Sequence, residues 1–246
     1  MKSFAPVNAE EREFYRHISD LTSKQSFYPR FTPFLTEREQ QLAKTAAASA
    51  GDDCSFWGGH DGAVRRMFSC PAADLEDFPL EAVTFFFREQ DRLTHRDFLG
   101  SLMSLGIKRD QVGDISVAVG AAVVFASKTV IPLFGEIEKV GRVGVRQQIG
   151  ICTHLPSQEY EEKSVICASN RIDAMIAAVC GLSREKASAL VRSGAVVIGG
   201  VQCASASENV EEGDTFTVKG YGKFIFDSFG APTKKGKNHI TIKKYK

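Results

Sequence analysis

Apolar positions near the C-terminus follow the spacing of two short helices. The first set falls at i, i+3, i+4, i+7 and i+8, which lie on one face of an α-helix. Its members are Ile172, Met175, Ile176, Val179 and Cys180. Gly181 and Gly194 follow the two apolar patterns, and glycine commonly ends helices because it accepts the left-handed conformation. Since Ser183 lies where an N-cap belongs, the pattern predicts one helix before Gly181 and a second from Ser183 to Gly194.

The second of these helices carries a polar stripe, and short β-branched runs follow it. Arg184, Ser188 and Arg192 are four residues apart, so they share one side of the helix, while Ala187 and Val191 share another. The β-branched runs cover residues 195–198, 215–218, 224–226 and 240–242, with Gly and Asp between them. Such punctuation is typical of a small antiparallel sheet. We therefore expect a helix pair packed on a sheet, with arginines left outside.

The first third of the chain predicts helices and a strand pair but no chemistry. Apolar periodicity favours a helix over residues 8–22 and a second over residues 37–50. Thr36, with Glu39 three residues later, is a capping box for the second helix. Residues 54–59 and 64–69 are predicted as paired strands, and the second carries Arg65 and Arg66. These two arginines either touch RNA beside an aromatic side chain or cover the edge of a sheet.

The middle of the chain follows the order β-α-β-β-α-β. We predict strands over residues 83–88, 114–119, 121–125 and 144–149, with helices over residues 95–103 and 128–139. Thr94 caps the first helix, Gly106 ends it, and Gly100 is expected to let it approach the sheet closely. This order is that of a ferredoxin-like sheet with two helices on one face, a fold that often binds RNA across its open sheet. A polar hinge is expected over residues 150–168.

These patterns predict an α+β protein of three parts. A chain of 246 residues is long enough for two or three small domains. The expected parts are an N-terminal helical and hairpin segment over residues 1–75, a ferredoxin- or RRM-like α/β domain over residues 76–162, and a small helix-and-sheet domain over residues 163–246. The last boundary is placed near Glu162, in the polar hinge.

Charge separates the C-terminal part from the rest. Residues 165–246 hold 12 Lys and Arg against 7 Asp and Glu, a net charge of +5, whereas the preceding residues hold 19 against 23, a net charge of −4. From Lys219 onward there are 8 lysines and one acid, Asp227. Clustered cations bind phosphates and release counterions, so affinity for a nucleic acid should fall steeply with salt. From charge alone, a solvated basic tail on an ordinary α+β domain remains open.

Composition and cysteine spacing exclude several classes of protein. No apolar run approaches the roughly 20 residues that span a bilayer, and the N-terminus soon turns acidic, unlike a secretory signal. The six cysteines form no Cys-x-x-Cys pair and have no histidine at zinc spacing. We therefore expect a cytoplasmic protein with no membrane partner, reduced cysteines, no metal site and no cofactor.

Four cations flank the first helix of the middle domain. His95 and Arg96 lie at its start, and Lys108 and Arg109 follow its end. We expect a phosphate of RNA to sit against them, with solvated helix ends as the alternative. Contacts to phosphate carry no sequence information, so these groups would position an RNA and leave specificity to its shape.

Four short motifs in the C-terminal part match a known RNA-binding module. They are Arg171-Ile172-Asp173, Leu182-Ser183-Arg184 with Ala187, Gly194-Ala195-Val196 and Gly213-Asp214. With these residues the chain resembles the S4 RNA-binding domain, of the αL type, found in a small-subunit ribosomal protein, tyrosyl-tRNA synthetases and many pseudouridine synthases, although Gly199 stands where an Asn is usual. The residues that match its RNA-facing positions are Arg171, Ser183, Arg184, Lys186 and Arg192. The lysines expected to extend this footprint are Lys219, Lys223, Lys234, Lys235 and Lys237.

Further motifs match a narrower family over nearly the full length. They are Gly58-Gly59, the run over residues 95–115 with its Gly-Ile-Lys-Arg and Gly-Asp elements, and the C-terminal Gly-Tyr-Gly-Lys and Thr-Lys-Lys-Gly-Lys runs. On these motifs the chain is identified as a member of the YlmH-like family of bacterial S4-domain RNA-binding proteins. The resemblance implies a non-enzymatic protein of Gram-positive bacteria and their relatives, encoded near cell-division genes. It also implies a role on the large ribosomal subunit in ribosome-associated quality control, holding peptidyl-tRNA while alanine tails are added, with rRNA and tRNA as partners.

Enzymes are the rival class, because S4 domains often accompany catalytic domains. The ATP-binding signatures of a tyrosyl-tRNA synthetase and the Gly-rich turn of a methyltransferase are absent from the sequence. His95-Arg96-Asp97-Phe98 only faintly resembles the Arg-Leu-Asp catalytic loop of a pseudouridine synthase. We therefore predict a monomeric RNA-binding protein without catalytic residues. The alternatives are an RNA-modifying enzyme of the pseudouridine synthase type and a cell-division interaction protein.

Overall fold

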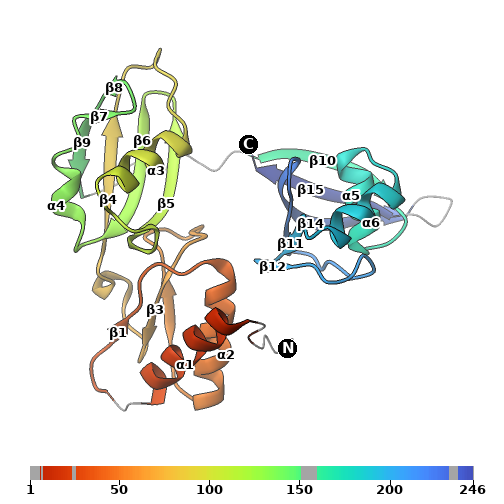
Figure 1. Cartoon of the computed structure of the whole chain (residues 1–246), viewed down its shortest axis with the longest axis horizontal. Coiled ribbons are helices and arrows are strands. Elements are labelled where there is room, and N and C mark those ends of the chain that lie inside the picture. The colour runs from red at the N-terminus through yellow and green to blue at the C-terminus, as the bar shows by residue number, and fades with distance from the viewer. Residues whose placement is uncertain (1–5, 7, 24–25, 151–159, 233–237, 246) are drawn as a thin grey trace. The chain divides into compact units, whose positions relative to one another are not determined.

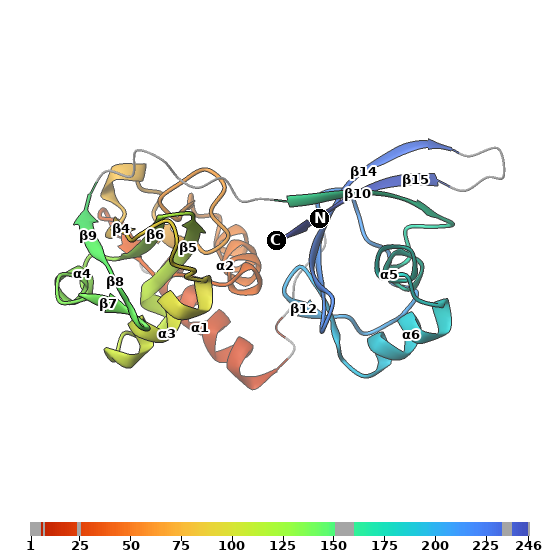
Figure 2. The ribbon, with the colours of Figure 1, turned by 90° about the horizontal axis from the view of Figure 1, so that it is seen from above.

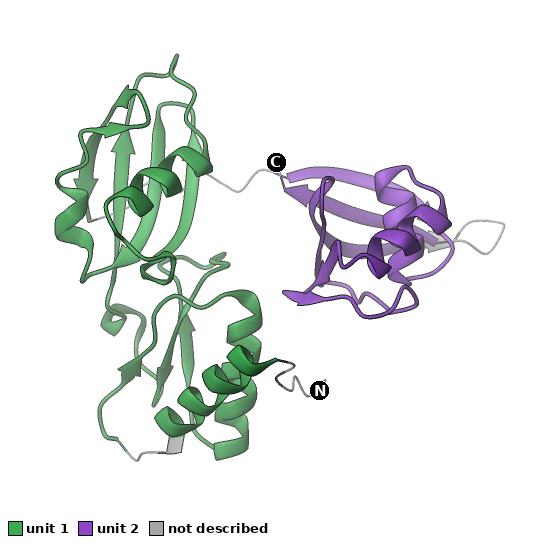
Figure 3. Ribbon diagram, viewed as in Figure 1, with its two compact units in different colours: residues 1–157 green, residues 158–246 purple. Residues whose placement is uncertain are grey.

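The chain folds into two compact units that each contain helices and sheets (Figure 1). The structure, a computed structural model, describes residues 6, 8–23, 26–150, 160–232 and 238–245. The units are Met1–Ser157 and Gln158–Lys246 (Figure 3). The α+β class expected from the sequence is confirmed, since both units combine helices with antiparallel sheets.

The first unit begins with two helices and a small three-stranded sheet. These elements are α1 (Ala9–Ser23), β1 (Arg30–Phe31), α2 (Glu37–Ala50), β2 (Ser55–Trp57) and β3 (Met67–Cys70). The strands pair antiparallel in the order β1-β3-β2. Thr36 and Glu39 form the predicted capping box of α2: the Glu39 amide donates to Thr36 Oγ1, and the Thr36 amide donates to the Glu39 carboxylate. The apolar sides of the two helices face each other across a small core, in which Ile18 and Ala43 are buried in one cluster with Phe68.

A four-stranded sheet with one main helix forms the rest of the first unit. Its elements are η1 (Leu75–Asp77), β4 (Leu80–Phe86), α3 (His95–Ser104), η2 (Arg109–Gln111), β5 (Val112–Ala118), β6 (Ala121–Ser127), α4 (Ile131–Phe134), β7 (Lys139–Val140), β8 (Val143–Gly144) and β9 (Arg146–Ile149). The sheet has the order β5-β6-β4-β9 with all neighbours antiparallel, and β7 and β8 form a separate hairpin. A β-α-β-β-α-β chain with this strand order is a ferredoxin-like sheet. Thr94 caps α3 through a capping box with Asp97.

The second helix of this sheet is much shorter than predicted. We expect it over residues 128–139 from the sequence, but α4 covers only Ile131–Phe134. Pro132 has no amide hydrogen and fits only the first turn of a helix, so no regular helix runs through it from residue 128. Gly135 follows as the C-cap. Ile137 is still buried in the core of the sheet, but it lies in the irregular segment that leads into β7.

The inner face of the sheet packs on α3. Phe98 and Leu102 of this helix are buried together with Val83 and Phe85 of β4. The expectation that Gly100 allows this approach is wrong, because a Cβ at Gly100 would have no atom within 4 Å. Gly100 is two residues from both Phe98 and Leu102, which is about 200° around the helix axis, so it lies on the solvent side.

The N-terminal segment covers part of the outer face of the same sheet. Val123 and Phe125 of β6 are buried there in one cluster with Phe34. Two glycines permit the close contact: a Cβ at Gly59 would lie 2.2 Å from the Phe125 ring, and a Cβ at Gly113 would lie 2.6 Å from the Phe34 ring. Each half of the first unit therefore contributes side chains to a shared core. A domain boundary near residue 75 stays a prediction.

Arg65 and Arg66 hold backbone within the first unit. Arg65 donates to the Val112 carbonyl from Nε (3.1 Å) and to the Phe34 carbonyl from Nη2 (2.8 Å). Arg66 donates from Nε to the Ala63 carbonyl at 2.7 Å. Both side chains are half-buried and hydrogen-bonded to backbone. A structural role in the first unit therefore explains Arg65 and Arg66 better than a contact with RNA.

The second unit packs two helices on one face of a six-stranded sheet (Figure 2). Its elements are β10 (Tyr160–Cys167), α5 (Ile172–Cys180), α6 (Arg184–Arg192), β11 (Val196–Ile198), β12 (Val201–Gln202), β13 (Thr215–Val218), β14 (Gly222–Pro232) and β15 (Asn238–Tyr245). The strand order is β10-β15-β14-β13-β11-β12, with antiparallel neighbours. Phe216, Phe224 and Phe226 form one core with Ile176 and Val191 of the helices. Both helices and the strands β11, β13, β14 and β15 lie where the sequence predicts them, whereas β10 and β12 are not predicted.

Part of the predicted hinge is a strand. We expect a polar hinge over residues 150–168, but Tyr160–Cys167 forms β10 and pairs along its whole length with β15. Glu162, beside which we expect a domain boundary, lies within this strand and opposite Lys243. Opposite charges across a strand pair stabilise it, which explains how an acidic segment forms an edge strand beside a basic one. Residues 151–159 lie outside the described residues.

Candidate RNA-binding surface

The helix pair α5–α6 is positioned by its caps. Gly181 adopts the left-handed conformation, with φ 67°, and ends α5. Ser183 then begins α6, where its hydroxyl accepts the amide of Lys186 at 3.2 Å. Ala187 and Val191 of α6 are buried, so the opposite side of the helix is left for charged side chains. Ser183 thus has a structural role in its own helix, and the RNA contact expected for it stays a prediction.

One buried acid holds two of the predicted arginines. Asp173, in the first turn of α5, has a side chain that is 5% exposed. Arg171 donates to its two carboxylate oxygens from Nε (3.2 Å) and Nη2 (3.0 Å), and Arg184 donates to the same oxygens from Nη2 (3.1 and 3.0 Å). The two arginine side chains remain 41% and 55% exposed. This cluster of Arg171, Asp173 and Arg184, the arginine cluster, therefore presents two fixed guanidinium groups to solvent.

The electrostatics of the arginine cluster keep Asp173 ionised. Burial raises the pKa of the Asp173 carboxyl, but hydrogen bonds from Arg171 and Arg184 outweigh burial and leave this pKa below its ordinary value. The same hydrogen bond raises the pKa of Arg171. The sequence motif gives no role to Asp173. The sequence does contain a signal for such a role. Asp173 follows Arg171 by two residues at the start of the first predicted helix, and the second predicted helix also starts with an arginine, Arg184.

The predicted contacts on α6 lie on two sides of the helix. Arg184 and Arg192 are exposed and eight residues apart, so they share one side. Lys186 is also exposed, but it is two residues from Arg184 and hence about 200° around the axis. Together with Leu190 and Tyr221 it borders a groove on that other side. The single basic face expected from the sequence is therefore divided, with Lys186 apart from the arginines.

The lysines that follow are spread over the second unit. Lys219 is exposed in the turn between β13 and β14. Lys223 is half-buried, and its ammonium group lies 5.0 Å from the centre of the Tyr245 ring. The expected contacts that lie outside the described residues are Lys234, Lys235 and Lys237. Among the described lysines of this group, Lys219 is thus the more accessible to a phosphate.

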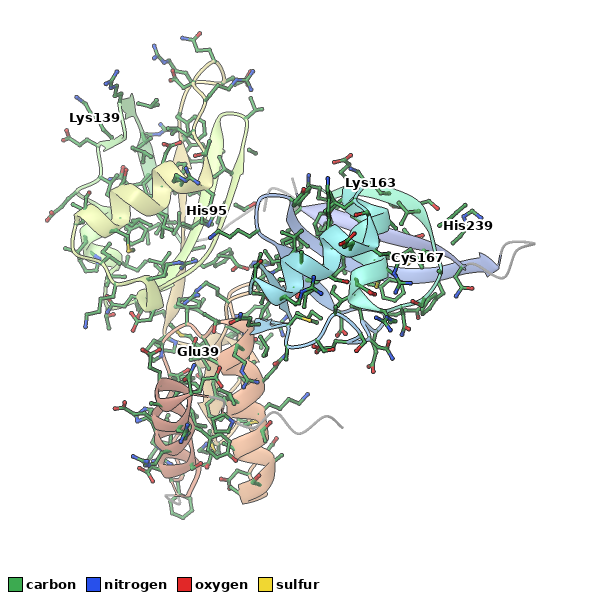
Figure 4. The ribbon with its side chains drawn as sticks, turned by 45° about the vertical axis from the view of Figure 1, so that its right-hand side comes forward. Glu39, His95, Lys139, Lys163, Cys167 and His239 are labelled. Atoms are coloured by element: carbon green, nitrogen blue, oxygen red, sulfur yellow. The ribbon has the colours of Figure 1, made fainter. Side chains whose placement is uncertain are left out.

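The four cations predicted around α3 do not form one site. His95 stands at the start of the helix (Figure 4), and Lys108 is exposed in the loop beyond its end. Arg109 turns inward instead, and its guanidinium donates to the backbone carbonyl of Gly113 at 3.2 Å. Burial and the nearby charge of Arg65 lower the pKa of Arg109 to about 10. Partial burial and the charge of Arg109 also lower the pKa of His95.

Arg96 faces a different part of the first unit. It lines an open groove of about 700 Å³ between α3 and the segment that leads into β7. Three acids, Asp97, Glu136 and Glu138, line the same groove together with Lys139. Because the acids outnumber the cations among these residues, a phosphate is a poor ligand for the groove.

The sheet of the first unit is only partly open to RNA. Its outer face is covered at Val123 and Phe125 by the N-terminal segment. On the uncovered part, Phe86 at the end of β4 is 36% exposed, and the Arg146 guanidinium lies 5.5 Å from the centre of its ring. The fold alone would suggest that RNA contacts the whole open face of the sheet. Here only the part around Phe86 is left uncovered for such a contact.

Other functions would require a metal site, a membrane-spanning helix or a reactive cysteine among the described residues. Among them, no group of three or more His, Cys, Asp and Glu side chains could hold a metal ion. No helix in the described ranges is both long and apolar enough to cross a membrane. Burial raises the pKa of the Cys54 thiol and raises that of Cys203 to about 11, so both thiols stay protonated at neutral pH.

Known proteins that match this chain include a family model, a curated relative and a solved structure. Residues 74–150 match a family model described as "Putative RNA-binding domain in YlmH". A protein of Bacillus subtilis (strain 168) named "Ribosome-associated protein quality control protein P2" is 28% identical over 233 residues, which cover 91% of this chain and 90% of the relative. A solved structure, "Cell division protein ylmH from Streptococcus pneumoniae", matches with a TM-score of 0.51 and 24% identity over 59% of this chain and 93% of that chain.

The three matches support different conclusions. The solved structure has low sequence identity, so its likeness bears on the fold alone. The family model covers the ferredoxin-like sheet of the first unit, from η1 to β9. The match to the Bacillus subtilis relative extends over nearly the full length of both proteins, so it includes the arginine cluster region as well as that sheet. The family model and the Bacillus subtilis relative together support the resemblance to the YlmH-like family that the sequence motifs indicate.

Proposed function

We propose that this protein binds structured RNA of the ribosome, with the second unit as an S4-type domain and its main contact. The observation that carries the proposal is the arginine cluster, in which buried Asp173 fixes Arg171 and Arg184 at the surface. A guanidinium group presents planar N–H donors that pair with two phosphate oxygens at once. Because the groups are already held in place, RNA binding loses little side-chain entropy. Arg192 extends the same side of α6.

The RNA that we propose as the ligand is rRNA and tRNA of the large ribosomal subunit. Support comes from the Bacillus subtilis relative, which is named for ribosome-associated quality control, and from the family model, which is named for RNA binding. In this role the protein stabilises peptidyl-tRNA on an obstructed subunit while alanine tails are added. It acts in the cytoplasm as a monomer, and it needs neither a cofactor nor catalytic residues.

The first unit supplies a second contact in this proposal. His95 and Lys108 lie at the two ends of α3 and belong to the family-model region. Arg96 and Arg109 are weaker candidates, because acids line the groove around Arg96 and the Arg109 guanidinium is bound to backbone. Phosphate contacts of this kind set the position of the RNA, and the shape of the RNA supplies specificity.

Removing two arginines tests the proposal. The variant is Arg184→Gln with Arg192→Gln in the full chain, and the measurement is sucrose-gradient sedimentation with ribosomal subunits at moderate salt. We expect most of the co-sedimentation to be lost, because both replaced groups face the proposed RNA. Glutamine is preferable to glutamate, since a carboxylate at position 184 would lie against Asp173 and destabilise the unit by repulsion.

The control removes the same charge elsewhere. Arg92→Gln with Arg142→Gln changes two exposed arginines of the first unit that are not among the proposed contacts. This variant should co-sediment like the wild type. If the Arg184 and Arg192 variant has a native circular dichroism spectrum and also co-sediments fully, the proposal is contradicted.

Two other functions have their own tests. An RNA-modifying enzyme would leave a new nucleoside in bulk RNA incubated with the protein, and nucleoside mass analysis should find none. A division scaffold is the alternative that the name of the solved relative favours. Pulldowns with division proteins after removal of RNA should therefore recover no specific partner if RNA binding is the main function.

A further inference from the structure

A groove in the second unit lies on the side of α6 away from Arg184 and Arg192. It has a volume of about 400 Å³ and lies between α6 and the turn that joins β13 to β14. The residues that line it are Leu182, Lys186, Ala189, Leu190, Ser193 and Tyr221. The four that belong to or follow α6 are spaced at i, i+3, i+4 and i+7, which places them on one helix face. A volume of this size is typical of sites that hold a small ligand.

The groove combines an apolar floor with a cationic rim. Leu182 and Leu190 are half-buried and form the floor, and Tyr221, which is 38% exposed, adds an aromatic ring. Lys186 is exposed at the rim, and Lys219 is exposed two residues before Tyr221 in the same turn. None of the six lining residues is acidic. The groove therefore suits a ligand that has a flat apolar face and a negative charge close to it.

The turn that carries Tyr221 is held by backbone hydrogen bonds. The Tyr221 amide donates to the Val218 carbonyl at 3.0 Å, and the Lys219 amide donates to the Ala195 carbonyl at 2.9 Å. Ala195 follows the end of α6, so these bonds connect the turn to the helix that forms the other wall. A ligand thus meets a groove whose two walls are already joined, which lowers the entropy cost of binding.

We propose that this groove accepts the base of one unpaired nucleotide in the bound RNA, stacked against Tyr221 with its phosphate beside Lys186. The inference rests on the proposed RNA-binding function. It adds a site that contacts a base of the RNA, whereas the arginines contact its phosphate backbone. Bases splayed out of folded RNA commonly stack on aromatic side chains, and cations beside such rings take the phosphates. An apolar peptide side chain would fill the floor but leave Lys186 and Lys219 without an opposite charge.

The test compares two RNA hairpins that differ only by one bulged uridine. The full chain is titrated against each labelled hairpin at fixed salt, and fluorescence anisotropy gives the dissociation constants. We expect the wild type to prefer the bulged hairpin by about five- to hundredfold, the effect of stacking one base on an aromatic side chain. Tyr221→Ala should abolish this preference, whereas Tyr221→Phe should keep it because the ring remains.

A second groove variant and a control complete the experiment. Ala189→Phe fills the groove from an exposed helix position and should also abolish the preference while Tyr221 is kept. Arg184→Gln with Arg192→Gln should weaken binding of both hairpins and leave their ratio unchanged, since these side chains lie on the other side of α6.

The outcomes separate this site from the wider function. If Tyr221→Ala and Ala189→Phe both keep the wild-type preference for the bulged hairpin, the groove does not bind a base. A protein partner would then be the occupant to test. Equal affinity of the wild type for the two hairpins would overturn the base site as well. Failure of the wild type to bind either hairpin would instead contradict RNA binding as a whole, and the base site with it.

Discussion

Asp173 is 4% exposed, yet it carries a charge beside the predicted RNA contacts. A buried carboxylate costs free energy unless it is paired and hydrogen-bonded, and Arg171 and Arg184 meet that requirement. The acid does not cancel the basic surface, because two arginines share it and both stay partly exposed. At the scale of the residue, the acid positions the cations with which a phosphate would pair.

Asp173→Asn should destabilise the second unit. The amide carries no charge and satisfies the two guanidinium groups less well, so we expect a loss of about 1–2 kcal/mol in the free energy of unfolding. The value is at the low end for charged hydrogen bonds because both arginines are partly screened by water. Urea unfolding of the variant, beside Glu185→Gln as an exposed acid on α6, measures the effect. An equal loss in both variants would contradict the role of Asp173.

The same pairing gives a defined dependence on pH. The pKa of Asp173 is lower in the folded protein than in the unfolded chain, so its stabilisation is fully present above the unfolded value of about 3.9. It is lost as the pH falls through the folded pKa. The difference in urea midpoint between the wild type and Asp173→Asn should therefore be constant near neutral pH and shrink below about pH 4. A difference that grows in acid would contradict this assignment.

At the scale of elements, contacts between distant segments decide which surfaces are open. The loop between β2 and β3 lies against β5, where the Asp114 carboxylate accepts the amides of Val64 (2.7 Å) and Arg65 (3.0 Å). His60 lies 3.3 Å from the same carboxylate. Burial raises the pKa of Asp114, but hydrogen bonds from His60 and the two amides leave it below its ordinary value. This acid therefore fixes the segment that covers part of the ferredoxin-like sheet.

Asp114→Asn should loosen this segment. An amide side chain has one carbonyl oxygen where the carboxylate has two acceptors, so one backbone amide loses its partner. We expect a cost of about 1–3 kcal/mol in unfolding free energy. Hydrogen exchange should also become faster at the amides of Val64 and Arg65. Asp61→Asn, an exposed acid of the same loop, is the control and should leave both measurements unchanged.

At the scale of the whole molecule, the opposite charges of the two ends of the chain matter most. Residues 165–246 carry a net charge of +5, and the preceding residues carry −4, so a nearly neutral protein has one strongly basic part. Such an asymmetry orients the protein toward a polyanion, because the basic part is attracted and the acidic part is repelled. Binding of RNA through the second unit should consequently dominate the salt dependence of the intact chain.

The salt dependence can be measured on the intact chain. In a plot of log affinity against log salt, each phosphate contact contributes a slope of about 0.7–0.9. Arg192→Gln should reduce the slope by about that amount and weaken RNA binding with little dependence on sequence. Glu185→Gln, on the same helix, should leave the slope as it is or raise it slightly. An Arg192→Gln protein with the wild-type slope would show that Arg192 does not contact phosphate.

Local patterns account for most of the elements. The capping box of Thr36, the N-cap at Thr94 and the left-handed Gly181 lie within the few residues that form each helix end, so the sequence alone predicts them. The four-stranded sheet of the first unit also follows from the order of its elements, since that order permits few topologies. Prediction failed for α4, where Pro132 outweighed the apolar spacing, and for β10, whose partner strand is distant in sequence.

By itself, the sequence determined the element pattern, the family resemblance and the basic C-terminal part, because periodicity, caps and charge counts need no knowledge of distant contacts. Only the tertiary structure decided which cations are available. It directed Arg65 and Arg109 to backbone carbonyls, separated Lys186 from the arginines of α6, and placed Asp173 between Arg171 and Arg184. The reason is that the orientation of a charged side chain depends on acceptors from other segments, and the chain brings those acceptors close only by folding.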